Sequence, residues 1–439
     1  MSGVRIPPCP IKNLYIEYLI STIMQTIRGT RDILPDEISE WQNLYLEALE
    51  LLTLHNYSEI RTPIIEQTEL FIKGVGNDTD IINKEMYNFI DQGDRKITLR
   101  PEGTASIARA FISNKLYINN RIQKLWYMGP MFRYERPQSG RQRQFHQLGI
   151  EYIGSDNPLT DVEIINLAHN ILQKLNCPTY TVEVNSIGTK EERMKYKKAL
   201  VNYLQQFKTE LDLDSQKRLE TNPIRILDSK NTRTQYILEG APCLSKHLGK
   251  ASLQDFEIVC EYLNMLKIPY IVNYKLVRGL DYYNGTAFEI INNQLGAKNT
   301  ICGGGRYNNL IQQLGGPNIP GVGCAIGIER LLMLIKHNKN DKNKKDRFHL
   351  LTQGSEAEKK AWHLIKWLEE EKIKFHIEFN QDSFQKKIKK AVKYKALGCL
   401  IIGPEEIRNS TITIKWLDKH YQKTIDYNNT INYIKQELN

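Results

Sequence analysis

The stretch that most constrains the fold spans residues 125–154, LWYMGPMFRYERPQSGRQRQFHQLGIEYIG. Its two ends carry alternating side chains with the period of two that is typical of β-strands. Between them, residues 136–144 hold a proline, a glycine and three arginines, which are too polar to be buried and favour a mobile loop. The stretch therefore predicts an antiparallel hairpin with guanidinium groups on its loop and flanks.

Guanidinium groups bind carboxylate and phosphate through paired hydrogen bonds, so the hairpin is a candidate anion clamp. A solvated basic loop has the same composition, and the hairpin alone leaves both interpretations open. The sequence has no Walker A pattern and no G-x-G-x-x-G between a strand and a helix, so arginines would have to hold any nucleotide phosphates. The candidates are Arg133, Arg141, Arg143, Arg278, Arg306 and Arg330. The positions of Arg133, Arg278 and Arg330 favour a site, because each is predicted at the end of an apolar strand or at a strand-to-helix junction.

The composition is that of a soluble globular protein of two or three domains, with 439 residues, 41% hydrophobic and 25% charged. A net charge of +10 indicates a polyanionic partner. Seven cysteines without a C-x-x-C pair favour a reducing compartment over a disulfide framework or a structural zinc site. The isolated His146 has no partner at metal-ligand spacing and is interpreted as structural.

No apolar run reaches the length that crosses a membrane, and the nearest, residues 14–24, contains Glu17. The chain also lacks a convincing cleavage site for a signal peptide. We therefore expect no membrane partner and no secretion, and a location in the cytoplasm or an organellar stroma. The abundance of Ile, Asn, Lys and Tyr is typical of an AT-rich genome such as that of a plastid.

Changes in pattern divide the chain into four parts. Residues 1–24 form an extension that is expected to be disordered or not translated, because Met24 reads as a natural start. Residues 25–335 form the main domain, which a charge-rich helical insertion interrupts at about residues 190–266. Residues 336–347 are predicted to be a linker, and residues 348–439 to be a small α/β domain with its own core.

Several local elements are predicted from periodicity and turn chemistry. A helix is expected over residues 36–55 with Asp36 as its cap, followed by a strand near Ile60 to Ile65 that places Pro63 at an edge or an interface. A hairpin ending at Arg100 precedes a helix that begins near Thr104. The last domain is expected to alternate between helices (356–371, 384–397 and a final one) and strands (375–379, 399–402 and 411–416).

Two further features leave their interpretations open. The glycine run 303–305 is either a simple turn or a place where a ligand approaches the backbone closely. The lysines between residues 386 and 395 are either a solvated helix face or a nucleic-acid contact. Tyr282 and Tyr283 lie between a predicted bend and a strand, and one of the two is expected to be a core aromatic.

From about residue 24 to its end, the chain resembles the class II aminoacyl-tRNA synthetases, and among them the histidyl-tRNA synthetase family. YSEIRTPIIEQ, FRYERPQSGRQRQFHQLGIEYIG and GIERLLML resemble motifs 1, 2 and 3 of the class. LVRGLDYYNGTAFE and CGGGRYNNL resemble the two signatures of the histidine enzymes, and RPEGT matches as well. The chain departs from the pattern at Asn308 and Asn309, where the family usually has Asp-Gly.

The resemblance implies an α+β fold: an antiparallel sheet flanked by helices, with a helical insertion and a C-terminal α/β anticodon-binding domain. It also implies a homodimer that ligates L-histidine to tRNA-His in two steps, with ATP and a histidyl-adenylate intermediate. Mg²⁺ would bridge the phosphates, with no metal ligand assigned to the protein. The alternative is an inactive synthetase-like regulatory or RNA-binding subunit.

The resemblance also implies a role for each matching residue. The ATP-binding residues would be Arg133, Arg141, Phe145 and Arg330. The histidine-binding residues would be Glu102, Thr104, Arg133, Gln147, Glu151, Arg278, Tyr282 and Tyr283. Arg278 and Arg133 would be catalytic, while Arg136 and Gln138 would contact the tRNA.

Overall fold

The structure is a computed structural model that describes residues 24–76, 79–118, 120–138, 140–292, 294, 300–338, 347–379, 382–419 and 421–438. The expected extension before Met24 and most of the expected linker, residues 339–346, lie outside this described part of the chain. The chain forms two compact units, Met1–Asn338 and Lys339–Asn439. Among the described helices, none combines the length and the apolar character needed to cross a bilayer.

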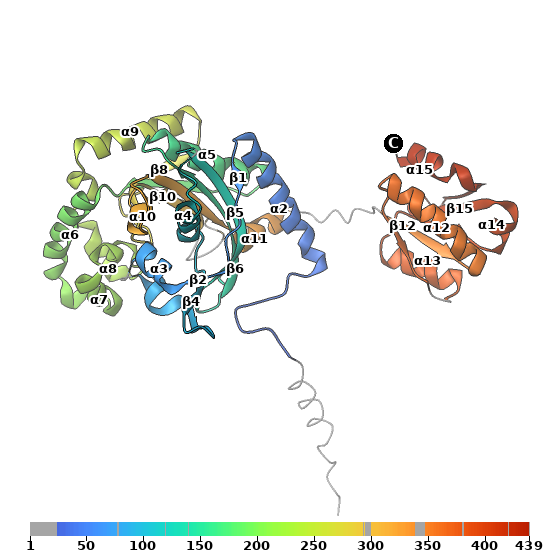
Figure 1. Cartoon of the computed structure of the whole chain (residues 1–439), viewed down its shortest axis with the longest axis horizontal. Coiled ribbons are helices and arrows are strands. Elements are labelled where there is room, and N and C mark those ends of the chain that lie inside the picture. The colour runs from blue at the N-terminus through green and yellow to red at the C-terminus, as the bar shows by residue number, and fades with distance from the viewer. Residues whose placement is uncertain are drawn as a thin grey trace, which may run out of the picture. The chain divides into compact units, whose positions relative to one another are not determined.

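The first unit is built on an eight-stranded sheet in the order β1-β5-β6-β11-β10-β9-β7-β8 (Figure 1). Its central pairs are antiparallel, and only the outer pairs β1–β5 and β7–β8 are parallel. The α+β prediction is therefore confirmed. The strands are β1 (Ser58–Glu59), β5 (Gln123–Phe132), β6 (Gln144–Ile153), β7 (Thr181–Ser186), β8 (Tyr270–Val272), β9 (Asn284–Ile291), β10 (Thr300–Arg306) and β11 (Gly321–Gly327).

Strands β5 and β6 form the predicted hairpin, with Met131 opposite Phe145 beside the loop. Because successive side chains of a strand point to opposite faces, β5 contributes to two cores. Trp126 belongs to a core shared with α2 (Pro35–Leu54), α5 (Leu159–Lys174), α9 (Lys250–Met265) and α11 (Ile328–Asn338). Leu125 and Tyr127 belong to a second core shared with α4 (Thr104–Ser113), α10 (Leu310–Gln313) and the insertion. The sheet is therefore covered on both faces.

The insertion is helical, as predicted, because its polar sequence carries repeated helix-start signals. Thr189 and Glu192 form a capping box at the first helix, and Asp212 caps the next. Pro223 then starts a 3₁₀ turn, since proline lacks the N–H that a continuing helix would use. The elements are α6 (Lys190–Gln205), η2 (Lys208–Glu210), α7 (Leu213–Thr221), η3 (Pro223–Asp228), α8 (Thr232–Glu239) and η4 (Leu244–His247), followed by α9.

A small three-stranded sheet, β2-β4-β3, precedes α4 in the chain. It confirms the predicted hairpin ending at Arg100. Pro63 lies between β1 and β2 rather than within a strand, and the glycine run 303–305 lies inside β10 rather than in a turn. Asp36 is not the cap of α2, because Pro35 occupies the first helical position and Leu34 the cap. The remaining elements are β2 (Ile65–Gln67), α3 (Thr68–Val75), η1 (Ile81–Glu85), β3 (Tyr87–Ile90) and β4 (Lys96–Leu99).

The second unit has a five-stranded sheet in the order β13-β12-β14-β15-β16, with its own buried core. The predicted alternation is confirmed, but the prediction missed β12, α14 and β16. Strand β16 reads YQKTID, and its mostly exposed side chains give no apolar alternation. The elements are β12 (Phe348–Thr352), α12 (Ser355–Glu370), β13 (Phe375–Ile377), α13 (Phe384–Lys393), β14 (Gly398–Ile402), α14 (Pro404–Asn409), β15 (Thr411–Trp416), β16 (Tyr421–Asp426), η6 (Tyr427–Asn429) and α15 (Thr430–Leu438).

Candidate active site

A cavity of about 200 Å³ in the first unit is lined by most of the residues that the sequence singled out. Its walls come from the β5–β6 hairpin, the start of α4, the segment before β9, strands β10 and β11, and the start of α11. The predicted residues that line it are Glu102, Thr104, Arg133, Arg141, Phe145, Gln147, Arg278, Tyr282, Tyr283 and Arg330. Among the residues given a role by the resemblance, Arg136, Gln138 and Glu151 do not line it, and neither do the candidate arginines Arg143 and Arg306.

The hairpin supplies one wall through residues at the loop end of its strands. Arg133 follows β5, and its Nε donates to the carbonyl oxygen of Pro101 at 2.8 Å. Its guanidinium carbon lies 5.2 Å from the ring centroid of Phe145 on β6. Two residues further along β6, on the same face, Gln147 also lines the cavity, and within the described residues its buried Oε1 finds no hydrogen-bond partner. Burial lowers the pKa of Arg133.

The loop of the hairpin is tied to the opposite wall of the cavity. Arg330 donates from Nε to the carbonyl oxygen of Gly140 at 3.0 Å and from Nη1 to that of Thr300 at 2.6 Å. Arg141 lies against the carboxylate of Glu135. Three guanidinium groups, those of Arg133, Arg141 and Arg330, therefore line one region of the cavity, which is the arrangement of an anion clamp.

Arg278 lies in the connection between β8 and β9, not at the end of a strand as predicted. Its guanidinium pairs with the carboxylate of Glu289 on β9. Burial alone would lower the pKa of Arg278, but Glu289 and the neighbouring tyrosines outweigh this and raise it. A Cβ at Gly303 would collide with the guanidinium, so any larger residue at this position of β10 would displace Arg278 from its present place. Among the described residues, the Nε of Arg278 has no hydrogen-bond partner.

Glu102 lies just before α4, and Thr104 is the first residue of that helix. The carboxylate of Glu102 accepts from the backbone N–H groups of Thr104 and Ala105, both at 2.7 Å, and from the hydroxyl of Tyr282 at 3.4 Å. Burial nevertheless raises the pKa of Glu102. The rings of Tyr282 and Tyr283 are 4.6 Å apart, and both are buried and line the cavity. One of the two was expected to be a core aromatic. Both belong to the core, and both also line the cavity.

Glu151 lies just outside the cavity wall and is fully buried. Its carboxylate accepts from the hydroxyl of Thr104 at 2.8 Å and from that of Tyr307 at 2.5 Å. Burial raises the pKa of Glu151 to about 8, because two hydroxyl donors do not offset the loss of solvent.

Two residues of this site were missed in the sequence. Tyr307 follows the glycine run in the quoted stretch CGGGRYNNL, and Glu289 is a lone carboxylate in the apolar strand GTAFEII. An acid within an apolar strand is a signal, because a buried charge needs a partner.

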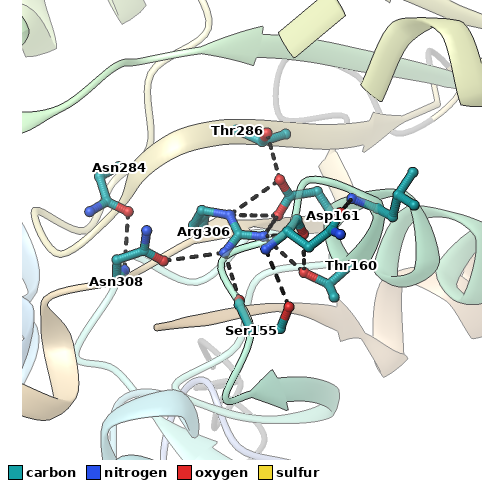
Figure 2. A network of polar contacts seen from close by, with 9 residues as sticks. Ser155, Thr160, Asp161, Asn284, Thr286, Arg306 and Asn308 are labelled. Carbon is teal, nitrogen blue, oxygen red and sulfur yellow. Dashed lines mark hydrogen bonds and ion pairs between the residues drawn. The ribbon is translucent and has the colours of Figure 1, made fainter. Parts of the chain in front are cut away.

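Arg306, one of the candidate arginines, does not line the cavity. It ends β10 and pairs with Asp161 of α5 at 3.0 Å. Figure 2 shows its guanidinium surrounded by oxygen atoms of the first turn of α5, of the segment before that helix and of Asn308. Its remaining contacts are to the carbonyl oxygens of Ser155 (2.9 Å) and Asn157 (3.0 Å), to Thr160 Oγ1 (2.8 Å) and to Asn308 Oδ1 (3.3 Å). This network links β10 to α5 and, through Thr286, to β9.

Two other candidates also have structural partners. Arg143 lies with its guanidinium 3.9 Å from the ring centroid of Tyr134 and does not line the cavity. His146 has its Nδ1 2.8 Å from Glu329 Oε1 and its ring against Trp41, as expected of a structural histidine. Within the described part of the chain, no group of three or more His, Cys, Asp or Glu side chains could hold a metal ion.

Comparison with known proteins gives the same picture for the whole chain. The family described as histidyl-tRNA synthetase matches residues 29–331, and the family described as anticodon binding domain matches residues 343–437. The chain is 59% identical to the chloroplastic histidine–tRNA ligase of Gracilaria tenuistipitata var. liui, over 94% of this chain and 98% of that protein. It is 48% identical to the histidine–tRNA ligase of the Rippkaea orientalis strain PCC 8801, over 94% and 96% of the two chains.

A solved structure is similar as well. The apo histidyl-tRNA synthetase of S. aureus is 36% identical, with a TM-score of 0.78 over 94% of this chain and 99% of that chain. A family match over most of the first unit and relatives of high identity along 94% of the chain agree with the cavity and its arginines. The chain belongs to the histidyl-tRNA synthetase family.

Proposed function

We propose that this chain ligates L-histidine to tRNA-His in two steps, through the side chains that line the cavity. ATP and histidine first give histidyl-adenylate and pyrophosphate, and the histidyl group then passes to the terminal adenosine of the tRNA. The observation that carries the proposal is that one cavity is lined both by guanidinium groups and by neutral polar side chains, which we assign to a cationic end and a polar end. Arg133, Arg141 and Arg330 supply the first, while Gln147 and Tyr283 belong to the second.

At the cationic end, Arg133 holds the α-phosphate and Arg141 reaches the β- and γ-phosphates. Arg330 binds the γ-phosphate and stacks on the adenine opposite Phe145. Each guanidinium is close enough to the cavity to donate to phosphate oxygens without a change of fold. The guanidinium of Arg133 now lies over Phe145, so it has to turn toward the phosphate when ATP binds.

At the polar end, Glu102, Thr104 and Gln147 bind the α-amino group of histidine, while Glu151 and Tyr283 read its imidazole. A site that hydrogen-bonds both ring nitrogens strongly rejects amino acids that lack them. The hydroxyl of Thr104 donates to the carboxylate of Glu151 in this structure. That hydroxyl has to rotate away before the imidazole of histidine can bind the carboxylate of Glu151. Burial raises the pKa of Tyr283 to about 12, which keeps its hydroxyl protonated and able to donate.

In the first step, a carboxylate oxygen of histidine forms a bond to the α-phosphorus, and the bond from that phosphorus to the departing pyrophosphate oxygen breaks. Arg278 neutralises the charge that builds up on the α-phosphate, and Tyr282 supports the adjoining wall. A fixed cation of this kind acts mainly in the transition state. In the second step, a ribose hydroxyl of the terminal adenosine attacks the carbonyl carbon, and AMP leaves.

ATP enters as its Mg²⁺ complex, since this ion keeps much of its shell as phosphate oxygens and water. The described residues offer no dedicated group of metal ligands, so we assign the ion to the nucleotide. It neutralises charge on the phosphates, as the three arginines also do.

The tRNA contacts involve both units. Arg136 and Gln138 are exposed on the hairpin loop and contact the end of the acceptor stem. The second unit binds the anticodon, and lysines of α13 such as Lys386 and Lys389 are available for phosphate contact. The active protein is a homodimer built on the motif 1 region. It works in a plastid stroma, an assignment supported by the chloroplastic relatives.

Histidine-dependent exchange between ATP and labelled pyrophosphate tests the first step, and charging of tRNA-His tests the second. We expect exchange with L-histidine and none with the other amino acids. A protein that binds ATP and tRNA without exchange would instead be the inactive, regulatory alternative, which no observation on this chain favours.

A further inference from the structure

The segment between β8 and β9 carries three proposed site residues, Arg278, Tyr282 and Tyr283, but belongs to no strand or helix. We call residues 278–283 the signature loop. Part of its backbone is held by α3, because the N–H of Asp281 donates to the carbonyl oxygen of Val75 at 3.1 Å. Loops of this kind need other partners to keep a fixed geometry, because buried backbone groups are costly to leave unpaired.

Those partners come from the helical insertion. Arg225 of η3 donates from Nη1 to the carbonyl oxygen of Arg278 at 3.1 Å. Asn222, which joins α7 to η3, donates to the carboxylate of Asp281 at 3.3 Å. Arg193 of α6 donates to the carbonyl oxygen of Tyr283. Three insertion side chains thus bind the beginning, the middle and the end of the signature loop.

Of these three side chains, Arg225 is the one that contacts the proposed catalytic residue, Arg278. Its side chain is 19% exposed, so water competes weakly for its hydrogen bonds. Its own carbonyl oxygen accepts from Arg218 at 3.4 Å. Asp80, near the start of η1, lies 3.9 Å from Arg225 and 3.5 Å from Arg218, which balances part of the charge. Arg225 therefore has a fixed position between the insertion and the carbonyl of the proposed catalytic arginine.

We propose that the insertion positions the signature loop for adenylate formation, with Arg225 as the main positioning residue. The proposal rests on the role assigned above to Arg278. In this proposal Arg225 acts through Arg278, because its hydrogen bond fixes the backbone from which Arg278 reaches the α-phosphate. Displacement of a reacting group by about 1 Å costs up to about 100-fold in rate, so a loosened loop lowers activity without unfolding the protein.

The test compares Arg225→Ala with Arg225→Lys in the full-length protein. Arg233→Ala is the matched control, since Arg233 lies in the same insertion on α8 and forms an exposed pair with Glu210. For Arg225→Ala we expect kcat for histidine-dependent pyrophosphate exchange to fall by about 10- to 100-fold, with a smaller change in KM for ATP. The lysine can still donate one hydrogen bond and should recover part of the loss. Activity of Arg225→Ala within about twofold of the unmodified protein would overturn the proposal.

A second measurement does not depend on activity. Hydrogen–deuterium exchange read by mass spectrometry should show faster exchange over the signature loop in Arg225→Ala and unchanged exchange in Arg233→Ala. Unchanged loop protection in Arg225→Ala overturns the proposal whatever the activity. Failure of the proposed function is seen separately, as absence of histidine-dependent exchange in the unmodified protein.

Discussion

Two buried arginine–carboxylate pairs in the first unit show how a satisfied cation differs from an available one. Arg306 pairs with Asp161, and every nitrogen of its guanidinium has an oxygen partner (Figure 2). Arg278 pairs with Glu289, but its Nε has no partner among the described residues and its side chain lines the cavity. The first pair holds strands to a helix. The second keeps hydrogen-bonding capacity for a ligand.

The largest effect is expected from breaking the satisfied pair. Arg306→Ala leaves the carboxylate of Asp161 buried with only the hydroxyl of Thr286 as a described partner, which should cost about 3–5 kcal/mol of unfolding free energy. Urea unfolding measures the loss. Arg95→Ala is the control, because Arg95 forms a solvent-exposed pair with Asp91 and its loss should change the unfolding free energy little. Equal losses in the two variants would remove the structural role of Arg306.

The available cation should show the opposite behaviour. Arg278→Ala is expected to lower the rate of adenylate formation by about 10²–10³-fold, because a charge that stabilises the transition state is lost. Its urea midpoint should fall less than that of Arg306→Ala, because the carboxylate of Glu289 is more exposed than that of Asp161 and keeps the hydroxyl of Thr300 as a donor. Single-turnover assays with histidine and ATP provide the rate, and a near-normal kcat would contradict the assigned role.

Glu151 extends the comparison to a buried carboxyl without a described guanidinium partner. Its pKa is raised from 4.5 to about 8, so the folded state holds a proton that the unfolded chain releases above its lower pKa. The proton on Glu151 therefore stabilises the folded state fully at pH values below 4.5, the pKa of the unfolded chain. This stabilisation is lost as the pH rises toward about 8, the pKa in the folded state. Between about pH 5.5 and 7, the contribution of Glu151 to the unfolding free energy should fall by about 2 kcal/mol. Glu151→Gln should remove that part of the pH dependence, and an identical pH profile would show that the pKa is not raised.

The smallest change tests the departure from the family pattern. Asn308 Oδ1 accepts from Nη1 of Arg306 at 3.3 Å, and Asn308→Asp makes this a charged hydrogen bond. Repulsion from Asp161 offsets part of the gain, so we expect stabilisation of less than about 1 kcal/mol. Thermal unfolding of the two proteins side by side measures it. A lower midpoint would show that Arg306 is already fully compensated by Asp161.

Much of the fold could be predicted because its signals are local. The hairpin β5–β6 has alternating ends and a polar arginine-rich loop, and the insertion repeats helix caps such as Thr189 and Asp212. Strand β16 gave no such signal because its exposed side chains need no apolar alternation. An acid such as Asp36 favours the start of a helix and so predicts a cap. The neighbouring Pro35 instead occupies the first position of α2 and sets where that helix begins.

The site was predictable where residue type limits the chemistry and unpredictable where contacts join distant segments. Arg133 and Arg330 stand out because a guanidinium after an apolar strand needs an anion. Arg306 has the same signal, and only the structure shows that Asp161, far away in sequence, is its anion. Likewise, neither the burial of Glu151 beneath Thr104 nor the reach of Arg225 to Arg278 can be read from spacing.

The contacts of Arg330 have a kinetic consequence. Its guanidinium donates to two carbonyl oxygens, that of Gly140 in the hairpin loop and that of Thr300, the first residue of β10. If Arg330 binds the γ-phosphate as proposed, the nucleotide has to share or exchange these partners after its first encounter with the protein. ATP association would then include a first-order rearrangement of the loop. The observed binding rate should level off at high ATP concentration instead of rising in proportion to it.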